Sequence, residues 1–245
     1  MRYLVLSDIH ANIDALTSVL ADAGRHGDAE ILLLGDLVGY GADPNGVIDR
    51  VRGLRVAAAV RGNHDRVACG LDGAEDFNDA ARESADRTAE ALTDDNREYL
   101  RGLPVGPLAV DDLVEICHGT PFDEDAYVFD EMDAVYALRT ASRPLCLFGH
   151  THSPLALSMA GDEVAFTAVT PGSTFRVKDG ARYLINVGSV GQPRDGDARA
   201  AYGIVDTERR EITCYRVEYP VDQAQARIRA AGLPEALARR LGLGR

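Results

Sequence analysis

The sequence has no long apolar run and no signal-like start, and both absences exclude classes of protein. No run of about 18 apolar residues occurs in the 245-residue chain, so a membrane-spanning helix is not expected. The chain enters an apolar stretch at Tyr3 without the basic region and apolar segment of a signal peptide. We therefore expect a cytoplasmic protein that has no membrane partner.

The chain also lacks paired cysteines and an excess of positive charge. Its four cysteines (Cys69, Cys117, Cys146 and Cys214) form no CxxC pair, and we expect reduced core residues rather than disulfides or metal ligands. Arginine and lysine total 26 against 39 acidic residues, a net charge of −13. This charge repels polyanions and argues against an extended nucleic-acid surface, while it allows a local cationic pocket or bound divalent metals.

The overall composition is that of a globular protein, with 46% hydrophobic and 27% charged residues. The length suits one large or two small α/β domains, and core size is not limiting. No linker, low-complexity segment or internal repeat interrupts the chain. We predict a single domain over residues 1–245.

Five apolar stretches end abruptly at Asp, His or Asn. The stretches are 3–6, 31–34, 56–60, 113–117 and 144–148. In the same order, the polar groups that follow them are Asp8 with His10, Gly35-Asp36, Gly62-Asn63-His64-Asp65, His118-Gly119 and Gly149-His150-Thr151-His152. Apolar runs of this length are typical of strands buried on both faces of a sheet. Because ligands bind beyond the carboxyl ends of such strands, the pattern predicts one polar site.

Helical patterns separate these stretches. Helices are predicted from Asn12 to Gly24, from Asp43-Pro44 to Arg52, over 76–101 with a break near Thr93, over 130–139, and over 221–241 with a break at 232–234. The first of them completes a β-α-β unit whose strands should pair in parallel. Segment 76–101 forms either a partial lid over the site or a peripheral helical pair. Beyond Ser153, successive short strands predict an antiparallel sheet packed on the first.

Histidines gather at the predicted strand ends. Five of the six histidines lie there, together with Asp8, Asp36 and Asn63, and such a cluster would be poorly compensated without a cation. Mixed imidazole, carboxylate and amide ligands favour divalent Mn, Fe, Zn, Co or Ni. Seven candidate ligands exceed the four of one tetrahedral site and suit two metals, which in hydrolases clamp both oxygens of an in-line displacement. Phosphoester hydrolysis is the reaction that this arrangement fits best.

In this order, the five polar groups resemble the signature motifs of the calcineurin-like metallophosphoesterases, and they span residues 8 to 152. Residues 186–197 further resemble the small bacterial phosphodiesterase branch of that superfamily. The branch commonly has proline where this chain has Val187, at a position that is not a ligand. The resemblance implies an α/β (α+β) fold, a four-layer αββα sandwich of two mixed β-sheets flanked by helices.

The resemblance also implies the ligand set. Asp8, His10 and His152 would hold the first of two divalent metals, Asp36 would bridge, and Asn63, His118 and His150 would hold the second. Manganese is our first choice, with Fe, Zn, Ni or Co as alternatives. A hydroxide shared by two cations has a pKa near neutrality and is then the nucleophile.

Other residues have two interpretations each. His64 is predicted to stabilise phosphoryl oxygens or to protonate the leaving group; Asp65 either orients His64 or caps a helix or turn. Asn12 either contacts phosphate or caps a helix, and Arg194 either clamps phosphate or pairs with Asp195 or Asp197. Tyr40 either lines the pocket or packs in its loop. Cys117 should point away from the site.

We therefore expect a metal-dependent phosphodiesterase acting on a small phosphoester or nucleotide. A phosphomonoesterase and a hydrolase of nucleotide or dinucleoside polyphosphate links need the same metal core and remain alternatives. A metal-bound scaffold without activity is the alternative from another class. An inactive scaffold would be indicated by the loss of a metal ligand, and all seven candidate ligands are present in the sequence.

Overall fold

The N-terminal apolar stretches form the parallel part of one sheet. In the computed structural model, which describes residues 1–128 and 130–245, β1 (Arg2–Leu6), β2 (Glu30–Leu33) and β3 (Val56–Ala59) pair in parallel. The connecting helices α1 (Ile13–Ala23) and α2 (Pro44–Arg52) begin at the predicted caps, because Asn12 and Asp43 accept hydrogen bonds from the main chain of the first turn. A 3₁₀ turn, η1 (Gly24–His26), follows α1.

The second sheet also begins with parallel strands. β5 (Val114–Ile116), β6 (Leu145–Phe148) and β10 (Ala181–Asn186) pair in parallel, and the short β4 (Leu108–Ala109) adds an antiparallel edge. Antiparallel β7 (Leu155–Ala160) and β8 (Glu163–Thr167) complete it. Over the described residues, the order β4-β5-β6-β10-β7-β8 makes this a six-stranded mixed sheet.

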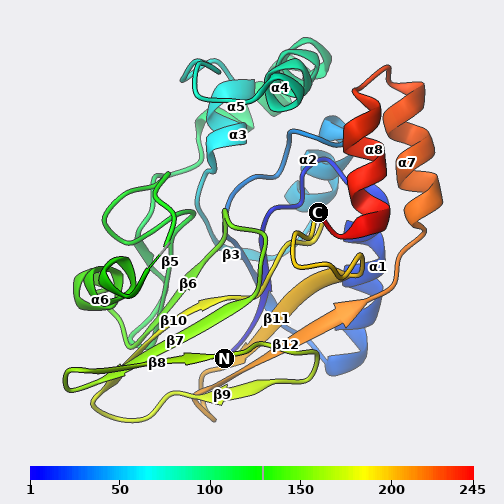
Figure 1. Cartoon of the computed structure of the whole chain (residues 1–245). Helices are drawn as coiled ribbons and strands as arrows, with labels where there is room; N and C mark the ends of the chain where they lie inside the picture. Colours follow the sequence, from blue (N-terminus) through cyan, green and yellow to red (C-terminus); the bar gives the residue numbers. More distant parts are fainter. Residues whose placement is uncertain (129) are drawn as a thin grey trace.

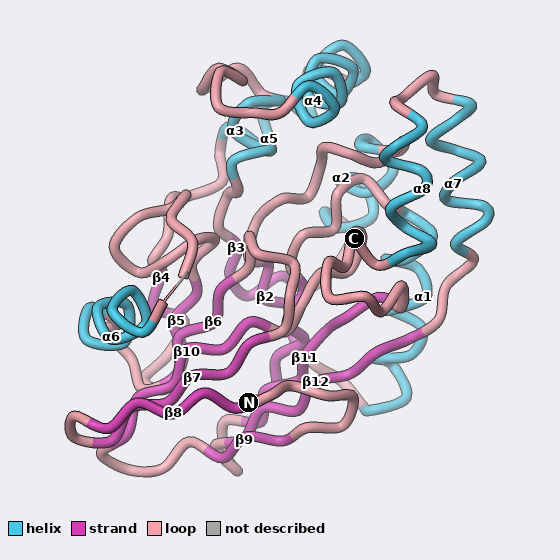
Figure 2. The backbone as a smooth tube through the Cα atoms, in the orientation of Figure 1, coloured by secondary structure: helices cyan, strands magenta, loops and turns pink. Residues whose placement is uncertain are grey.

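The expectation of a separate antiparallel sheet beyond Ser153 is wrong. Short strands do follow Ser153, as expected, but they divide between the two sheets (Figure 2). β11 (Ala200–Asp206), β12 (Glu211–Val217) and β9 (Thr174–Arg176) extend the first sheet to the order β3-β2-β1-β11-β12-β9. Residue alternation identifies a strand but not its partner, which depends on contacts far away in the sequence.

The layers follow from three buried clusters. Val5, Leu32 and Ile185 belong to the cluster between the sheets. Leu16 and Leu237 belong to the cluster under α1, α7 (Val221–Ala230) and α8 (Glu235–Leu243), and a third cluster lies under α6 (Glu131–Thr140). Figure 1 shows the sheets between these helices. The predicted four-layer sandwich is confirmed.

Segment 76–101 forms two helices, α4 (Asp79–Ala91) and α5 (Asp94–Arg101), and Thr93 caps the second at the predicted break. A short helix that the sequence did not predict, α3 (Asn63–Ala68), begins at the third strand end. These helices lie together beyond one end of the sheets (Figure 1). Among the described residues, none of the helices has the length and apolar character needed to cross a bilayer.

Candidate metal centre

Five of the predicted ligands have left-handed backbone. Their φ angles lie between 49° and 65° for Asp8, His10, Asp36, His150 and His152. This conformation is costly for residues with a side chain, about 1 to 3 kcal/mol each, and persists only where the surroundings determine it. Here the loops after β1 and β2 are joined by main-chain hydrogen bonds from Asp8 to Gly35 (3.1 Å) and from His10 to Asp36 (3.0 Å).

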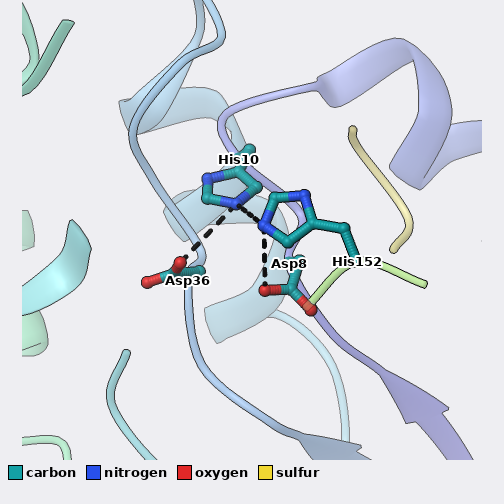
Figure 3. A group of neighbouring side chains, drawn as sticks. All are labelled: Asp8, His10, Asp36 and His152. Carbon is teal, nitrogen blue, oxygen red and sulfur yellow. Dashed lines mark hydrogen bonds and ion pairs between the residues drawn. The ribbon is translucent and has the colours of Figure 1, made fainter. Parts of the chain in front are cut away.

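The first group of side chains converges from three loops. Asp8, His10, Asp36 and His152 are all buried, and their ligand atoms lie within 4.8 Å of one another. His10 Nε2 lies 3.0 Å from His152 Nε2 and 3.6 Å from Asp36 Oδ2, and His152 Nε2 lies 3.4 Å from Asp8 Oδ1. Figure 3 shows these side chains pointing toward one another.

Asp36 also belongs to a second group. Its Oδ2 lies 3.5 Å from His118 Nε2, which in turn lies 3.2 Å from His150 Nδ1. Asn63 Oδ1 lies 3.2 Å from the same His118 nitrogen. The structure therefore brings all seven predicted ligands into two adjacent groups, and the Asp36 carboxylate is common to both.

Three of the histidines direct Nδ1 at a main-chain carbonyl oxygen 2.7 to 3.0 Å away. The pairs are His10 with Val38, His118 with Leu34 and His152 with Gln192. Burial lowers the pKa of His10 and His152 well below its usual range, so both imidazoles are neutral. With the proton on Nδ1, the two facing Nε2 atoms both present lone pairs, an arrangement that repels unless a cation lies between them. The residues fit a divalent metal.

The charges in the second group fit the same conclusion. Burial raises the pKa of Asp36, but the imidazoles of His118 and His64 outweigh burial and hold it well below its usual range. Burial lowers the pKa of His118, yet the Asp36 carboxylate raises it to about 10. His150 has a pKa lowered to about 3 by burial. Buried Asp36 is therefore a negative charge that needs a positive one beside it, and a divalent cation held by the same residues would supply it.

The proposed pairing of His64 with Asp65 is not formed. Asp65 instead accepts main-chain hydrogen bonds from Gly62 (3.0 Å), Leu37 (2.9 Å) and Val38 (3.2 Å), because it is the third residue of α3 and faces the loop after β2. The capping interpretation of Asp65 is the one that the structure supports. Buried His64 Nδ1 has no hydrogen-bond partner in the described part of the chain.

Asn12 has a structural role. Its side chain accepts from the main chain of Ala15 (3.1 Å) and donates to the carbonyl of Gly191 (2.9 Å), so its oxygen and its amide group are both already engaged. These hydrogen bonds support the capping alternative, and the phosphate contact stays a prediction. Cys117 points away from the site, as predicted, and packs beside Cys146 in the cluster under α6.

Arg194 is not paired with Asp195 or Asp197. Those acids instead bind Arg216 and Arg199, respectively. Arg194 donates from Nε and Nη2 to Gln192 Oε1, at 3.2 and 2.9 Å, and its main-chain nitrogen donates to His152 O. The guanidinium is therefore held beside the predicted metal ligands.

A cavity of about 280 Å³ opens over the two groups. Its walls contain predicted residues, among them Asp36, His64, Tyr40 and Arg194. They also contain residues that sequence reasoning missed: Arg66, Phe77, Tyr127 and Arg240. The Tyr127 ring lies 4.0 Å from that of His150, and the Phe77 ring lies 4.5 Å from that of His64. Only the start of segment 76–101 borders the cavity; whether that segment acts as a lid stays a prediction.

The segment after β10 supports the ligand loops. Buried Asn186 donates to the carbonyl of Gly149 (2.7 Å) and to Thr151 Oγ1 (3.0 Å), and Ser189 donates to the carbonyl of Asp8 (2.8 Å). Val187, which departs from the common motif, is buried in the apolar cluster between the sheets. This departure leaves the supporting hydrogen bonds in place.

The chain belongs to the calcineurin-like phosphoesterase superfamily, whose domain matches residues 1–210. A metallophosphoesterase from Sphaerobacter thermophilus is 39% identical, with a TM-score of 0.86 over 100% of this chain and 99% of that chain. An uncharacterized protein of Methanocaldococcus jannaschii is 35% identical over 98% of this chain and 97% of its own length. A hypothetical protein of Pyrococcus horikoshii, 23% identical, shares the fold with a TM-score of 0.78 over 98% and 97% of the two chains.

Proposed function

We propose that the chain is a hydrolase of phosphoesters, with phosphodiesters preferred, that works with two divalent metal ions, manganese first among them. The observation that carries the proposal is the Asp36 carboxylate, which is common to two groups of buried ligands. One metal would be held by Asp8, His10, Asp36 and His152. The other would be held by Asp36, Asn63, His118 and His150, which completes the set.

Two such cations supply Lewis acidity to phosphoryl oxygens and lower the pKa of water towards neutrality. The chain's own residues do the rest. His64, neutral because burial lowers its pKa to about 4, lines the cavity and offers an N–H to a phosphoryl or leaving oxygen. Arg194 offers a guanidinium to the equatorial oxygens, where negative charge is spread in the transition state. A cytoplasmic location stays a prediction.

The test uses chelated protein re-supplied with Mn, Ni, Co, Zn or Mg. Hydrolysis of bis-p-nitrophenyl phosphate is compared with that of p-nitrophenyl phosphate. We expect metal-dependent turnover with preference for the diester. Preference for the monoester would favour a phosphatase instead. No turnover with any metal, in protein that binds two ions, would favour the inactive scaffold.

The site assignment is tested separately by Asp36→Asn. Because Asp36 is common to both groups, this variant should lose activity and metal while it keeps its circular dichroism spectrum. Asp112→Asn, at an exposed aspartate outside the cavity, is the matched control and should behave like the unmodified protein. Normal turnover by Asp36→Asn would contradict the assignment.

A further inference from the structure

Three arginines line the cavity, and they differ in what neutralises them. Arg66 is paired with acids: its guanidinium lies 2.7 Å from Glu124 and Asp125 and 2.9 Å from Asp72. Neither Arg194 nor Arg240 pairs with the side chain of an aspartate or glutamate in the part of the chain that the structure describes. In a chain of net charge −13, two half-buried guanidinium groups without an aspartate or glutamate beside them are unexpected.

Arg194 and Arg240 lie beside the same ring. The guanidinium carbon of Arg194 lies 5.5 Å from the centre of the Tyr40 ring, and that of Arg240 lies 5.8 Å from it. Both distances fit cation–π contact. Tyr40 in turn packs against His10, with ring centres 4.7 Å apart, so the pair adjoins the metal ligands.

Both guanidinium groups are positioned by hydrogen bonds, but each keeps N–H donors that have no acceptor among the described residues. Arg240, near the end of α8, donates from Nε to the main-chain oxygen of Arg245 (2.9 Å), and Arg194 donates from Nε and Nη2 to Gln192. Within residues 1–128 and 130–245, no partner is found for either Nη of Arg240 or for Nη1 of Arg194. Burial and the neighbouring Arg194 lower the pKa of Arg240, as expected for like charges without an anion between them.

We propose that Arg240, together with Arg194, binds a second phosphoryl group of the substrate, next to the one that reacts. This inference rests on the proposed function. Arg194 is anchored at His152 and is near the reacting group, whereas Arg240 comes from the C-terminal helix at the cavity wall. The favoured substrates are therefore nucleotides or related molecules with two phosphoryl groups joined by an oxygen, rather than esters with one.

The test compares two chromogenic esters that differ by one phosphoryl group, the p-nitrophenyl esters of AMP and of ADP. In each, a water oxygen bonds to the terminal phosphorus, the bond to p-nitrophenolate breaks with its electron pair on the phenolate, and the water protons pass to solvent. The unmodified protein should have the higher kcat/KM on the ADP ester. Arg240→Gln should reduce the ratio of the two kcat/KM values by about tenfold, mainly through KM, because it loses charge-assisted hydrogen bonds.

Arg239→Gln is the matched control, since Arg239 is the exposed neighbour on the same helix and its loss changes the net charge equally. It should leave the ratio unchanged, and Arg240→Lys should restore part of it. A ratio equal in Arg240→Gln and unmodified protein would overturn the subsite while leaving the proposed hydrolase intact. Inactivity of the unmodified protein on both esters and on bis-p-nitrophenyl phosphate would overturn both proposals.

The anion bound by Arg194 and Arg240 could also be free inorganic phosphate rather than a phosphoryl group of the substrate. If the arginine pair served a separate phosphate ion, phosphate would protect the unmodified protein against heat and Arg240→Gln would lose this protection, while the ester ratio stayed the same. That outcome would overturn the substrate subsite. A loss of the ester ratio in Arg240→Gln protein that melts at the normal temperature supports it.

Discussion

Gly62 offers a test of how closely the ligand geometry is set. A Cβ added there would lie 2.5 Å from the main-chain nitrogen of Asp36 and closer still to its Oδ1. Real Cβ atoms essentially never approach within 3.0 Å, so in Gly62→Ala the separation between residue 62 and Asp36 must grow by at least about 0.5 Å. The obstacle is purely steric, because Gly62 has φ of −107°, which alanine adopts without strain.

The shift moves the one carboxylate that both ligand groups share. We expect kcat/KM on bis-p-nitrophenyl phosphate with manganese to fall by about 100-fold, the usual consequence of a misplacement near 1 Å. Overpacking should also reduce the free energy of unfolding by about 1 to 3 kcal/mol, measured by urea denaturation. Circular dichroism should show a folded protein, and calorimetry should show weaker metal binding.

The control is Gly24→Ala at the end of α1, where nothing lies within 4 Å of the added Cβ and φ is −58°. It should leave activity and metal binding unchanged. A Gly62→Ala protein that turned over at the normal rate would refute the reasoning, because it would show that the Asp36 carboxylate can move without loss. That result would also remove the main support for a shared carboxylate.

Three further substitutions separate structural roles from chemical ones. Asn12→Ala should cost about 1 to 2 kcal/mol of unfolding free energy through the lost cap, measured by urea denaturation; a large rise in KM would contradict its structural role. Asp65→Ala leaves three buried main-chain N–H groups without an acceptor and should cost at least about 3 kcal/mol in the same measurement; a loss below 1 kcal/mol would show that water replaces the carboxylate. His64→Ala should lower kcat by about 100-fold or more while mass spectrometry finds the normal metal content; loss of metal would instead make His64 a ligand.

The convergence of the candidate ligands was predictable because their positions follow from local pattern and one topological rule. Strands such as 3–6 and 31–34 are recognisable by their continuous apolar character, and parallel strands place their carboxyl ends at one edge of a sheet. Asp8 and Asp36 therefore had to be neighbours, and the structure joins their loops by main-chain hydrogen bonds. No detail of packing was needed for that step.

The roles of Asn12 and Asp65 could not be settled in this way. A short polar side chain at the start of a helix fits both a cap and a ligand contact, and the choice depends on what lies across the fold. For Asp65 the deciding groups are the main-chain nitrogens of Leu37 and Val38, which lie 28 and 27 residues earlier in the sequence. Arg240 gave no signal at all, since it reaches the cavity from the C-terminal helix and resembles any other helical arginine.

The strained backbone of the ligands explains why so much of the surrounding polar network is buried. Left-handed conformations at positions such as Asp8 and His150 cost free energy that the ligands alone do not return. His150 donates its main-chain N–H to Asp8 Oδ1 (3.1 Å), and Ser189 and Asn186 hold the carbonyls on either side of this contact. These hydrogen bonds hold the loops in their left-handed conformations. The convergence of the candidate ligands therefore depends on this buried polar network as well as on the ligands themselves.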